Sequence, residues 1–394
     1  MRRDLPIVVA GAGIGGLAAA LALARAGRRV AVLERAATID EVGAGLQIAP
    51  NAGRVLQGLG LSDALDAVAL SPEAVNIRRA RDGAVLARLD ISGAKARWGA
   101  PFRLFHRADL QQLLLCAVED CDGTSVRAGA RVGDFEEDGG VVELRVHGAA
   151  GPEDMEAAAL VGADGVRSSV RSFLRTDQSD APAYSGCTAW RAIVSAADVP
   201  VAARKREISV WLGRGAHVVH YPLRDGSIVN VVVVVEDGGA RVTEGPLAFS
   251  GEQVLREAGF GGCDGDLRAV VEAGPSFRRW PLYARPPLTR WSQGAVTLLG
   301  DAAHPMLPFL AQGAAQALED AEALGRAATG GAPLPQAFRA YEQARLARAT
   351  RVQRASRRQG LFYHAGAPLA FARDIALALL GGQGVLGRAA WLYR

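Results

Sequence analysis

Short apolar runs and longer helical patterns follow one another in an order that predicts a mixed fold at the start of the chain. Residues 7–10 form an apolar run of strand length, a glycine-rich turn follows, and small and apolar residues suited to a helix extend over residues 17–25. Residues 30–33 form a second apolar run. A helix between two short apolar strands is typical of a β-α-β unit with parallel strands. We therefore predict that the chain opens with such a unit.

Strand-length segments return in two later stretches. Residues 75–80 and 85–91 are joined by Arg81-Asp82-Gly83, which favours a tight hairpin. From about residue 184 to 280 the pattern is again one of short strands separated by turn residues, with candidate strands at 189–194, 207–212, 218–223 and 227–235. We expect these segments to form an antiparallel β-sheet inserted into the first fold.

The remaining segments favour helices, short strands and one loop. Residues 43–51 are too glycine-rich for a strand and too apolar for a surface linker, so we expect a loop that lies against a ligand. An acidic turn is expected over residues 134–140. Other strands are predicted at 125–132, 141–146, 160–163 and 295–299. Helices are predicted at 56–70, 105–119, 313–328 and from residue 335 onwards. The first of these helices is expected to be interrupted at Gly58 and Gly60.

Length and composition indicate a globular protein with a large core. The chain has 394 residues, of which 49% are hydrophobic and 22% charged, which is ordinary for an enzyme of two domains. No run reaches the roughly 18 uninterrupted apolar residues of a membrane span, so we expect no membrane association.

Charge and cysteine usage exclude further classes. The net charge is +4, but Lys95 and Lys205 are the only lysines and the arginines are scattered among acids, so we expect no nucleic-acid partner. The four cysteines form no CxxC pair and no metal-ligand spacing with histidine, so we expect no metal site and no disulfide framework. A cytoplasmic location is predicted.

The glycine-rich turn has the spacing of a dinucleotide fingerprint, Gly11-Ala12-Gly13-Ile14-Gly15-Gly16. Gly11 permits the tight turn, Gly13 lets backbone N–H groups approach a pyrophosphate, and Gly16 lets helix and strand pack closely. The pyrophosphate would lie at the helix N-terminus. Glu34 ends the second strand, where a carboxylate can accept hydrogen bonds from a ribose diol.

The same stretch has a competing interpretation. Arg2-Arg3, the apolar run and the small residues near Ala24 resemble a secretory signal peptide. Glycines at fingerprint spacing and a matching strand after the helix favour the nucleotide fold.

Three separated stretches then point to one family. These are the fingerprint with Glu34, the turn Gly162-Ala163-Asp164-Gly165, and Gly300-Asp301-Ala302-Ala303-His304-Pro305. With the inserted β-sheet, the chain resembles the single-component FAD-dependent aromatic hydroxylases, the group that includes salicylate, 3-hydroxybenzoate and 6-hydroxynicotinate monooxygenases. The resemblance extends over essentially the whole chain.

The resemblance implies an α/β fold of two domains with C-terminal helices. A Rossmann-like FAD-binding domain is expected from residues 1–72, 100–180 and 281–330. An inserted antiparallel β-sheet domain that binds substrate is expected from residues 73–99 and 181–280, followed by a helical region at 331–394.

The resemblance also implies the residues that contact FAD. Asp301 would hold the ribityl hydroxyls, Asp164 would lie near the pyrophosphate and, transiently, near NAD(P)H, and the helix that begins at Gly313 would stabilise negative charge on the reduced flavin. Pro308 would lie beside the ring. The full expected set is Gly11, Gly13, Gly15, Gly16, Glu34, Arg35, Gln47, Arg107, Val132, Asp164, Asp301, Pro308, Gly313, Ala314 and Ala315.

A histidine and a tyrosine in the β-rich stretch are the candidates for substrate chemistry. His217 and Tyr221 are four residues apart, so in a strand they share one face, with His220 on the other. Imidazole titrates near neutral pH and suits removal of a phenol proton, and relatives use a His and a Tyr at this spacing for that purpose. The expected substrate pocket is Gln47, His217, Tyr221, Pro308 and Phe309. Some relatives carry a polar residue such as histidine where this chain has Gln47 and Phe309. His304 is expected to have a structural role.

The predicted function is therefore an FAD-dependent monooxygenase. NADH or NADPH would reduce FAD, and a flavin C4a-hydroperoxide formed with O2 would hydroxylate a small hydroxyaromatic, either a hydroxybenzoate or a hydroxypyridine carboxylate. The protein would be a monomer or a homodimer. Two alternatives stay open: an FAD-dependent oxidase or dehydrogenase on the same fold, and a nonenzymatic nucleotide-binding protein.

Overall fold

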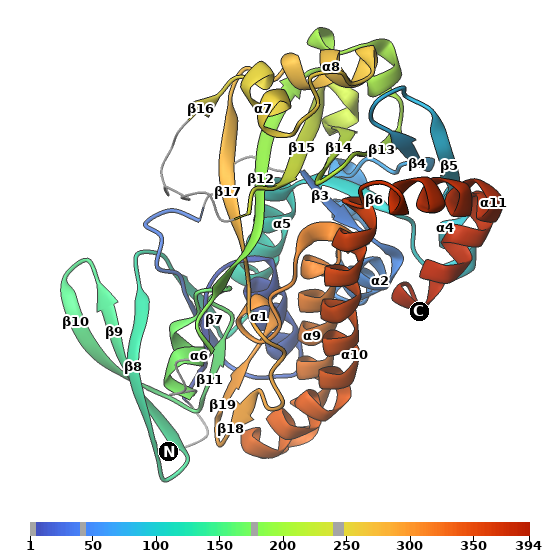
Figure 1. The fold of residues 1–394 in the computed structure, drawn as a ribbon. Coiled ribbons are helices and arrows are strands. Elements are labelled where there is room, and N and C mark those ends of the chain that lie inside the picture. Colours follow the sequence, from blue (N-terminus) through green and yellow to red (C-terminus); the bar gives the residue numbers. More distant parts are fainter. Residues whose placement is uncertain (1–4, 40–44, 175–179, 239–247) are drawn as a thin grey trace.

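The computed structural model describes residues 5–39, 45–174, 180–238 and 248–394 (Figure 1). A six-stranded sheet carries the N-terminal unit. Its central strands are parallel, as the short apolar runs predict, and only its edge strand β18 pairs antiparallel among the described strands. The order is β18 (Ser292–Gln293), β19 (Val296–Leu298), β11 (Ala159–Gly162), β1 (Ile7–Ala10), β2 (Val30–Leu33) and β7 (Thr124–Arg127).

Helices cover this sheet and connect its strands. The fingerprint leads directly into α1 (Ile14–Arg25), a helix of mostly buried small and apolar residues that packs against α5 (Arg107–Glu119) and α9 (Gly313–Ala327). Small residues allow this close packing. Shorter helices complete the domain: α2 (Pro50–Gly58), α3 (Ser62–Val68) and α6 (Ser169–Leu174).

An eight-stranded sheet forms the second layer. It is antiparallel except that β13 and β4 run parallel, the one such pair among its described strands. The expected hairpin over residues 75–91 adds its strands at one edge. The order is β16 (Ala248–Phe249), β17 (Phe277–Ala284), β12 (Ala183–Ser195), β15 (Ile228–Glu236), β14 (Ala216–Leu223), β13 (Glu207–Leu212), β4 (Ala74–Arg79) and β5 (Val85–Asp90).

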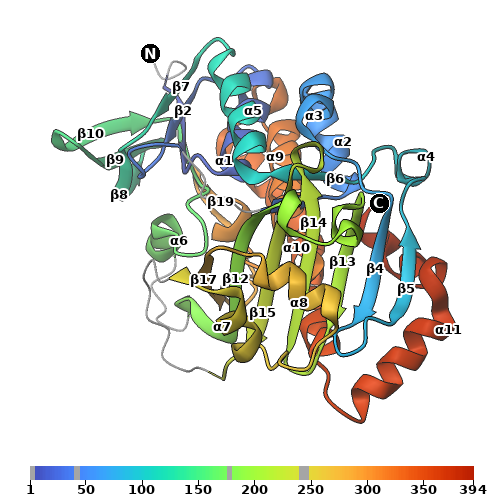
Figure 2. The same cartoon turned by 90° about the horizontal axis from the view of Figure 1, so that it is seen from above.

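The two faces of this sheet have separate cores. Figure 2 shows α7 (Gly251–Glu257) and α8 (Gly265–Glu272) in front of the sheet and α10 (Leu334–Tyr363) behind it. The α7–α8 face buries Val218, Val231 and Val233, while the opposite face packs toward Phe309 and the C-terminal helices. The second face is therefore the one turned toward the first domain.

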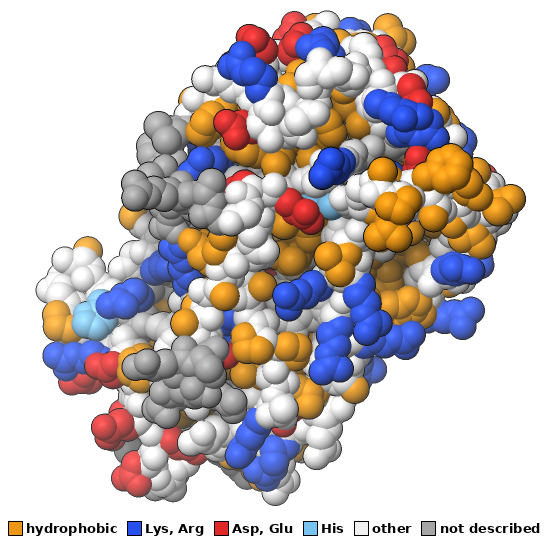
Figure 3. Space-filling model, in the orientation of Figure 1, with side chains coloured by type: hydrophobic (Ala, Val, Ile, Leu, Met, Phe, Trp, Pro, Cys, Tyr) orange, Lys and Arg blue, Asp and Glu red, His pale blue; other side chains and the backbone are white. Residues whose placement is uncertain are grey.

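The C-terminal helices close the side of the molecule between the two sheets. Long α10 runs beside α9, and α11 (Leu369–Ala389) packs on β5 (Figure 1). Figure 3 shows apolar side chains over α11 and basic ones over α10. By length and composition, Leu369–Leu392 could cross a membrane. Gly381 (φ +57°) breaks the helix there into two parts, each shorter than the roughly 20 residues of a span.

Several elements differ from the sequence-based expectations. The stretch expected as a loop contains strand β3 (Gly45–Ile48), which pairs with β6 (Arg103–His106); residues 43–44 lie outside the described residues. The expected acidic turn is wrong over most of its length, because β8 (Arg131–Asp138) continues to Asp138 before turning into β9 (Val141–Gly148). The strand expected over residues 125–132 is split between β7 and β8. Pairing with distant strands determines where these elements begin and end. Local composition does not indicate such pairing.

A projecting arm and several short helices complete the fold. Strands β8, β9 and β10 (Gly151–Ala157) extend away from the body in Figure 1. The short helices are α4 (Ala94–Trp98), η3 (Ala196–Asp198), η4 (Val201–Arg204), η5 (Arg224–Gly226), η6 (Gly300–Ala302), η7 (Pro308–Leu310), η8 (Thr329–Gly331) and η9 (Ala390–Leu392).

Candidate active site

The three glycine turns noted in the sequence meet at one edge of the six-stranded sheet. Strands β1, β11 and β19 are adjacent and parallel, so the turns that follow them lie side by side. A Cβ added to Gly11 would lie 2.6 Å from the carbonyl oxygen of Ala163. A Cβ on Gly15 would lie 2.9 Å from that of Ala317 in α9. The predicted convergence of the stretches near residues 11, 164 and 301 is therefore present.

The fingerprint turn leaves room for a bound pyrophosphate. Apart from its own neighbours in the chain, no atom of the described residues lies within 4 Å of the position that a Cβ on Gly13 would take. A Cβ on Gly16 would lie 2.0 Å from the carbonyl oxygen of Gly11. Gly13 thus faces open space at the start of α1, and Gly16 packs helix against strand. Gly16 thus has the packing role predicted for it, and the space at Gly13 is compatible with the predicted approach of a pyrophosphate.

Asp164 offers an oxygen that none of the described residues uses. Its Oδ2 accepts a hydrogen bond from the Ser169 amide at 2.7 Å, near the start of α6, as an N-cap residue would. Its Oδ1 is buried without a partner among the described residues. A buried, unpaired carboxylate oxygen is costly, so this atom fits a polar ligand group. Val132 lies nearby, with its carbonyl oxygen 3.5 Å from Ser169 Oγ.

Glu34 and Arg35 follow β2. The Glu34 carboxylate accepts hydrogen bonds from the amide of Ala12 at 2.8 Å and from that of Ala36 at 2.9 Å, so it also braces the fingerprint turn. A carboxylate has about four acceptor positions, so capacity remains for a ribose diol. The Arg35 side chain is exposed beside it.

Asp301 lies in η6, directly after β19. Solvent reaches its side chain, yet it sits deep enough among protein atoms that burial raises the pKa of its carboxyl, with His304 and Arg107 opposing the rise. A side chain both enclosed by protein and reached by solvent is one that lines a recess. Arg107, the first residue of α5, is thus close enough to Asp301 to act on it electrostatically.

The segment between η7 and α9 turns sharply toward the same region. Ala311 has a left-handed conformation (φ +51°), and α9 starts two residues later at Gly313. No side chain of the described residues caps the helix, so the amides of its first turn, including those of Ala314 and Ala315, can bind an anionic group. These observations together fit a dinucleotide cofactor with its pyrophosphate near α1 and its ring near α9.

A large cavity lies between the eight-stranded sheet, η7 and the C-terminal helices. Its volume is about 1270 Å³, and Gln47, His217, Pro308 and Phe309 of the predicted pocket line it. Tyr221 is absent from the described residues that line the cavity. It is buried behind Gln47, with which it forms a hydrogen bond. Four of the five expected pocket residues therefore meet at one cavity, with the fifth in contact with them.

The two candidate side chains have opposite electrostatic behaviour. Burial lowers the pKa of His217 well below its ordinary value, and the neighbouring His364 adds to the effect, so His217 is neutral at pH 7. Burial raises the pKa of Tyr221, so its hydroxyl stays protonated. His220 points to the other face, as the alternation predicts, where it stacks on Trp211.

The sequence did not identify two groups next to His217. His364, at the C-terminal end of α10, lies with its Nε2 2.7 Å from His217 Nδ1, and Glu236 at the end of β15 lies 3.0 Å from His364 Nδ1. A stretch of 147 residues separates the two histidines. No local sequence pattern predicts their contact. A histidine at the end of a long predicted helix was the one feature that could have drawn attention to His364.

A buried network holds the Gly300-Asp301 turn in place. Asp320 of α9 accepts hydrogen bonds from the Gly300 amide at 3.1 Å and from His304 Nε2 at 2.6 Å, and pairs with Arg345 of α10 at 2.7 Å. His304 therefore has the structural role expected for it. Asp301 is left facing the recess.

Comparison with known proteins agrees with this site. The family model described as FAD binding domain matches residues 4–356, so the chain belongs to that family. It is 38% identical over 368 residues to 3-hydroxybenzoate 6-hydroxylase of Polaromonas naphthalenivorans (strain CJ2), covering 92% of this chain and 89% of the relative. It is 40% identical over 365 residues to 3-amino-4-hydroxybenzoate 2-monooxygenase of Streptomyces cremeus, covering 92% and 88%.

Solved structures show the same fold. The R204Q variant of HpxO from Klebsiella pneumoniae, complexed with FAD, superimposes with a TM-score of 0.86 at 25% identity and covers 98% of both chains. A salicylate hydroxylase substrate complex gives a TM-score of 0.81 at 26% identity, covering all of this chain and 96% of the other. The chain is thus a flavoprotein monooxygenase of the aromatic hydroxylase group. FAD is its cofactor and NADH or NADPH its co-substrate.

Proposed function

We propose that the substrate is a hydroxylated aromatic acid, with a hydroxybenzoate as its simplest form and a hydroxypyridine carboxylate as the second candidate. The similarity to enzymes named for 3-hydroxybenzoate and 3-amino-4-hydroxybenzoate supports this class, as does similarity to 6-hydroxynicotinate 3-monooxygenase. Apolar walls that include Phe309 suit the ring, and arginines from the C-terminal helices line the outer cavity, where they favour an anion.

The observation that carries the proposal is a buried imidazole in the cavity wall. His217 lines the cavity, is 3% exposed and lies 5.6 Å from the ring of Phe309, measured between ring centroids. A neutral imidazole accepts a proton, so we assign His217 as the base that takes the proton of the ring hydroxyl. Loss of that proton makes the ring a better nucleophile toward an electrophilic oxygen.

Gln47 and Tyr221 hold the ring in place rather than remove its proton. Tyr221 keeps its own proton because burial raises the pKa of its hydroxyl. Gln47 lines the cavity and has no titratable group, and Pro308 and Phe309 close the wall beside it. In this arrangement Gln47 contacts the substrate, and Tyr221 orients the Gln47 amide from behind.

The cofactor assignments follow from the recess described above. Asp164, Asp301 and the first turn of α9 would hold the pyrophosphate, the ribityl chain and the ring edge, with Gly13 at the pyrophosphate and Glu34 at the ribose. When bound, FAD supplies electron transfer from NAD(P)H and activation of O2. The contribution of this chain is to exclude water, hold both partners and set the charge of the substrate.

We also propose the predicted division into domains. The six-stranded sheet lies wholly within residues 1–72, 100–180 and 281–330, and the eight-stranded sheet within 73–99 and 181–280 except for the end of β17. Residues 331–394 cover the cavity. A cytoplasmic location fits the four free cysteines, which form no disulfide.

The test is NADH and NADPH oxidation across isomeric hydroxybenzoates and hydroxypyridine carboxylates, with identification of the product. We expect one of these compounds to be hydroxylated, with label from isotopic O2 in the product; turnover without label would indicate an oxidase or dehydrogenase. His217→Gln should lower the hydroxylation rate by about 100-fold or more and divert NAD(P)H oxidation to hydrogen peroxide.

His220→Gln is the matched control for the base. It lies on the same strand with the same 3% exposure but faces the opposite core. It should retain coupling if it folds, which thermal denaturation checks. An unchanged rate and unchanged coupling in His217→Gln would remove His217 from its assigned role.

A further inference from the structure

A chain of hydrogen bonds leads from the cavity wall to solvent. His217 lines the cavity and contacts His364, and His364 contacts Glu236. The side chain of His364 is 1% exposed, whereas that of Glu236 is 45% exposed. Three side chains from β14, α10 and β15 thus connect a buried base to bulk water.

The backbone fixes the relative positions of these side chains. The amide of Gly215 donates to the carbonyl oxygen of His364 at 3.0 Å, and the amide of Glu236 donates to the carbonyl oxygen of Gly215 at 2.7 Å. His364 also ends α10, where its amide bonds to Gly360 at 3.0 Å. The contact between the two histidines is therefore built into the fold.

The carboxylate sets the direction of the whole chain. An ionised carboxylate only accepts hydrogen bonds, so Nδ1 of His364 must carry a hydrogen and donate a hydrogen bond to Glu236. In a neutral His364, Nε2 is then the acceptor, and Nδ1 of His217 must be the donor. This leaves Nε2 of neutral His217 as an acceptor, which is the state that a general base needs.

We propose that His364 and Glu236 form a proton relay that orients His217 and carries the substrate proton from it to solvent. The relay rests on the proposed role of His217 and deepens it. His364 and Glu236 are positioning residues in this scheme, because they act through His217 and do not touch the substrate.

The proton transfers balance along the chain. The ring hydroxyl gives its proton to Nε2 of His217 as the O–H bond breaks, and Nδ1 of His217 gives its own proton to Nε2 of His364. Nδ1 of His364 then protonates Glu236, which releases one proton to water. The substrate is left as a phenolate, one proton reaches solvent, and both imidazoles are neutral before and after the transfer. After hydroxylation, one proton that enters from solvent and moves in the reverse direction protonates the ring oxygen of the product and restores the starting tautomers.

The charges around His364 suit this path. Burial lowers the pKa of His364, and Arg373 lowers it further, while Glu236 opposes the shift. Arg373 itself pairs with Asp374 at 2.9 Å. Among the described residues, His217 and Cys187 are further titratable groups beside His364, and the ring of Tyr363 lies against His217. A neutral His364 at pH 7 can pass a proton in either direction.

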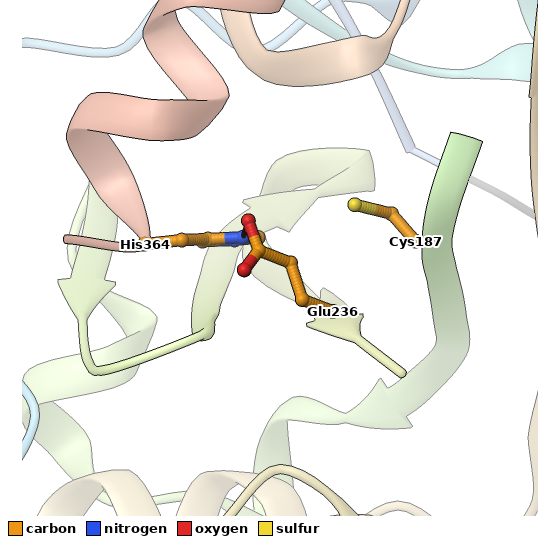
Figure 4. Close-up of side chains that lie close together, drawn as sticks. All are labelled: Cys187, Glu236 and His364. Carbon is orange, nitrogen blue, oxygen red and sulfur yellow. Dashed lines mark hydrogen bonds and ion pairs between the residues drawn. The ribbon is translucent and has the colours of Figure 1, made fainter. Parts of the chain in front are cut away.

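Cys187, together with His364 and Glu236, could instead form a metal site. Figure 4 shows its side chain with those of His364 and Glu236, and the three potential ligand atoms lie within 4.8 Å of one another. Burial, with Glu236 and Asp237 adding to it, raises the pKa of the Cys187 thiol to about 11. A hydrogen bond with Ser185 opposes this rise. His364 already uses both ring nitrogens in hydrogen bonds, so a metal ion bound there would have to displace His217 or Glu236. The geometry therefore favours the relay over a metal site.

The test measures ionisation of the bound phenol directly. The ultraviolet change on mixing enzyme with the hydroxybenzoate that the substrate panel selects gives the rate of phenolate formation. We expect Glu236→Gln and His364→Gln to slow this step by roughly 10-fold to 100-fold. Added formate or imidazole should restore the rate in proportion to its concentration, a response that a purely structural role would not produce.

Two variants serve as controls. Asp237→Asn removes a negative charge one residue away, on a side chain that accepts hydrogen bonds from Thr188 at 2.6 Å and from Tyr184. It should leave the rate unchanged. Cys187→Ser should do the same, and metal analysis of the holoenzyme should find no stoichiometric zinc. Stoichiometric zinc that is lost in Cys187→Ser would overturn the relay.

The outcomes separate the relay from the function on which it rests. If His217→Gln slows phenolate formation while Glu236→Gln and His364→Gln do not, the base stands and the relay is wrong. If all three variants form phenolate at the wild-type rate, the base itself is wrongly assigned. Slow formation in all three, with buffer rescue only in the two relay variants, is the expected result.

Discussion

At the scale of single residues, two glycines of one turn perform different tasks. Gly13 has a backbone conformation open to any residue (φ −71°) and space around its Cβ position. Gly16 has neither the space nor a movable neighbour, because the backbone of Gly11 is in the way. A methyl group at the first position would enter open space, where the pyrophosphate is predicted to bind, and at the second it would meet the protein backbone.

We therefore expect Gly13→Ala to fold normally and to bind FAD weakly. The apoprotein should unfold at the wild-type temperature, while flavin fluorescence titration should show a dissociation constant raised by 10-fold or more. Gly16→Ala should instead unfold at lower temperature, with or without FAD. Loss of apoprotein stability in Gly13→Ala would show that the turn has no free space for the pyrophosphate.

The pH dependence of turnover reports on the burial of His217. A protonated imidazole cannot accept the substrate proton, so kcat/KM falls as pH drops through the pKa of the free enzyme's base. Burial and His364 lower that pKa below the ordinary 6.5. The acid limb of kcat/KM should therefore lie below pH 6.5, with a plateau between about pH 6.5 and 8. An acid limb at or above 6.5 would contradict a buried neutral base.

At the scale of elements, α9 and α10 are joined by the buried Asp320 to Arg345 pair, which also ties down the Gly300-Asp301 turn. Burial alone would raise the pKa of Asp320, but His304 and Arg345 outweigh it and lower the pKa to about 2. The contact thus connects the stability of two helices to the position of a predicted cofactor ligand.

Asp320→Asn should lower the free energy of unfolding by about 3 kcal/mol, because it leaves the buried Arg345 with less negative charge. A depressed pKa in the folded state stabilises it above the ordinary value of 3.8, and this stability is lost as pH falls from there through about 2. Urea denaturation from pH 7 to acid should show that component in the wild type and not in the variant. Glu322→Gln, on the exposed side of α9, should cost less than about 1 kcal/mol.

The elements also show how far a single sequence leads. The β-α-β unit, the hairpin over residues 75–91 and the strand candidates between 189 and 235 were predicted because their signals are local. Strand β3 was missed because its partner lies at residues 103–106, and glycine at position 45 is required by distant neighbours. A Cβ there would lie 2.6 Å from the amide carbon of Asn230. His364 was missed because only the fold brings it to His217.

At the scale of the whole molecule, the predicted FAD contacts come from turns far apart in the chain. The turns after β1, β11 and β19 and the start of α9 begin near residues 11, 163, 300 and 313. The three turns share one sheet edge and α9 packs on η6 beside them, but in the sequence the strands of the projecting arm and of the second sheet lie between the turns. A ligand that contacts all four would therefore join segments that are far apart in the sequence.

Removal of FAD should therefore loosen several distant segments at once. Ligand at 100 times its dissociation constant stabilises a folded protein by about 2.7 kcal/mol, so the apoprotein should unfold a few degrees lower and recover when FAD is restored. Hydrogen exchange should show protection by FAD in residues 11–16, 163–165, 300–303 and 313–316 together. AMP, which lacks the ring and the ribityl chain, should protect the first segments and leave the last two unchanged. Protection confined to residues 11–16 in the presence of FAD would mean that the four turns do not share one ligand, because a cofactor spanning the sheet edge must shield amides at both of its ends.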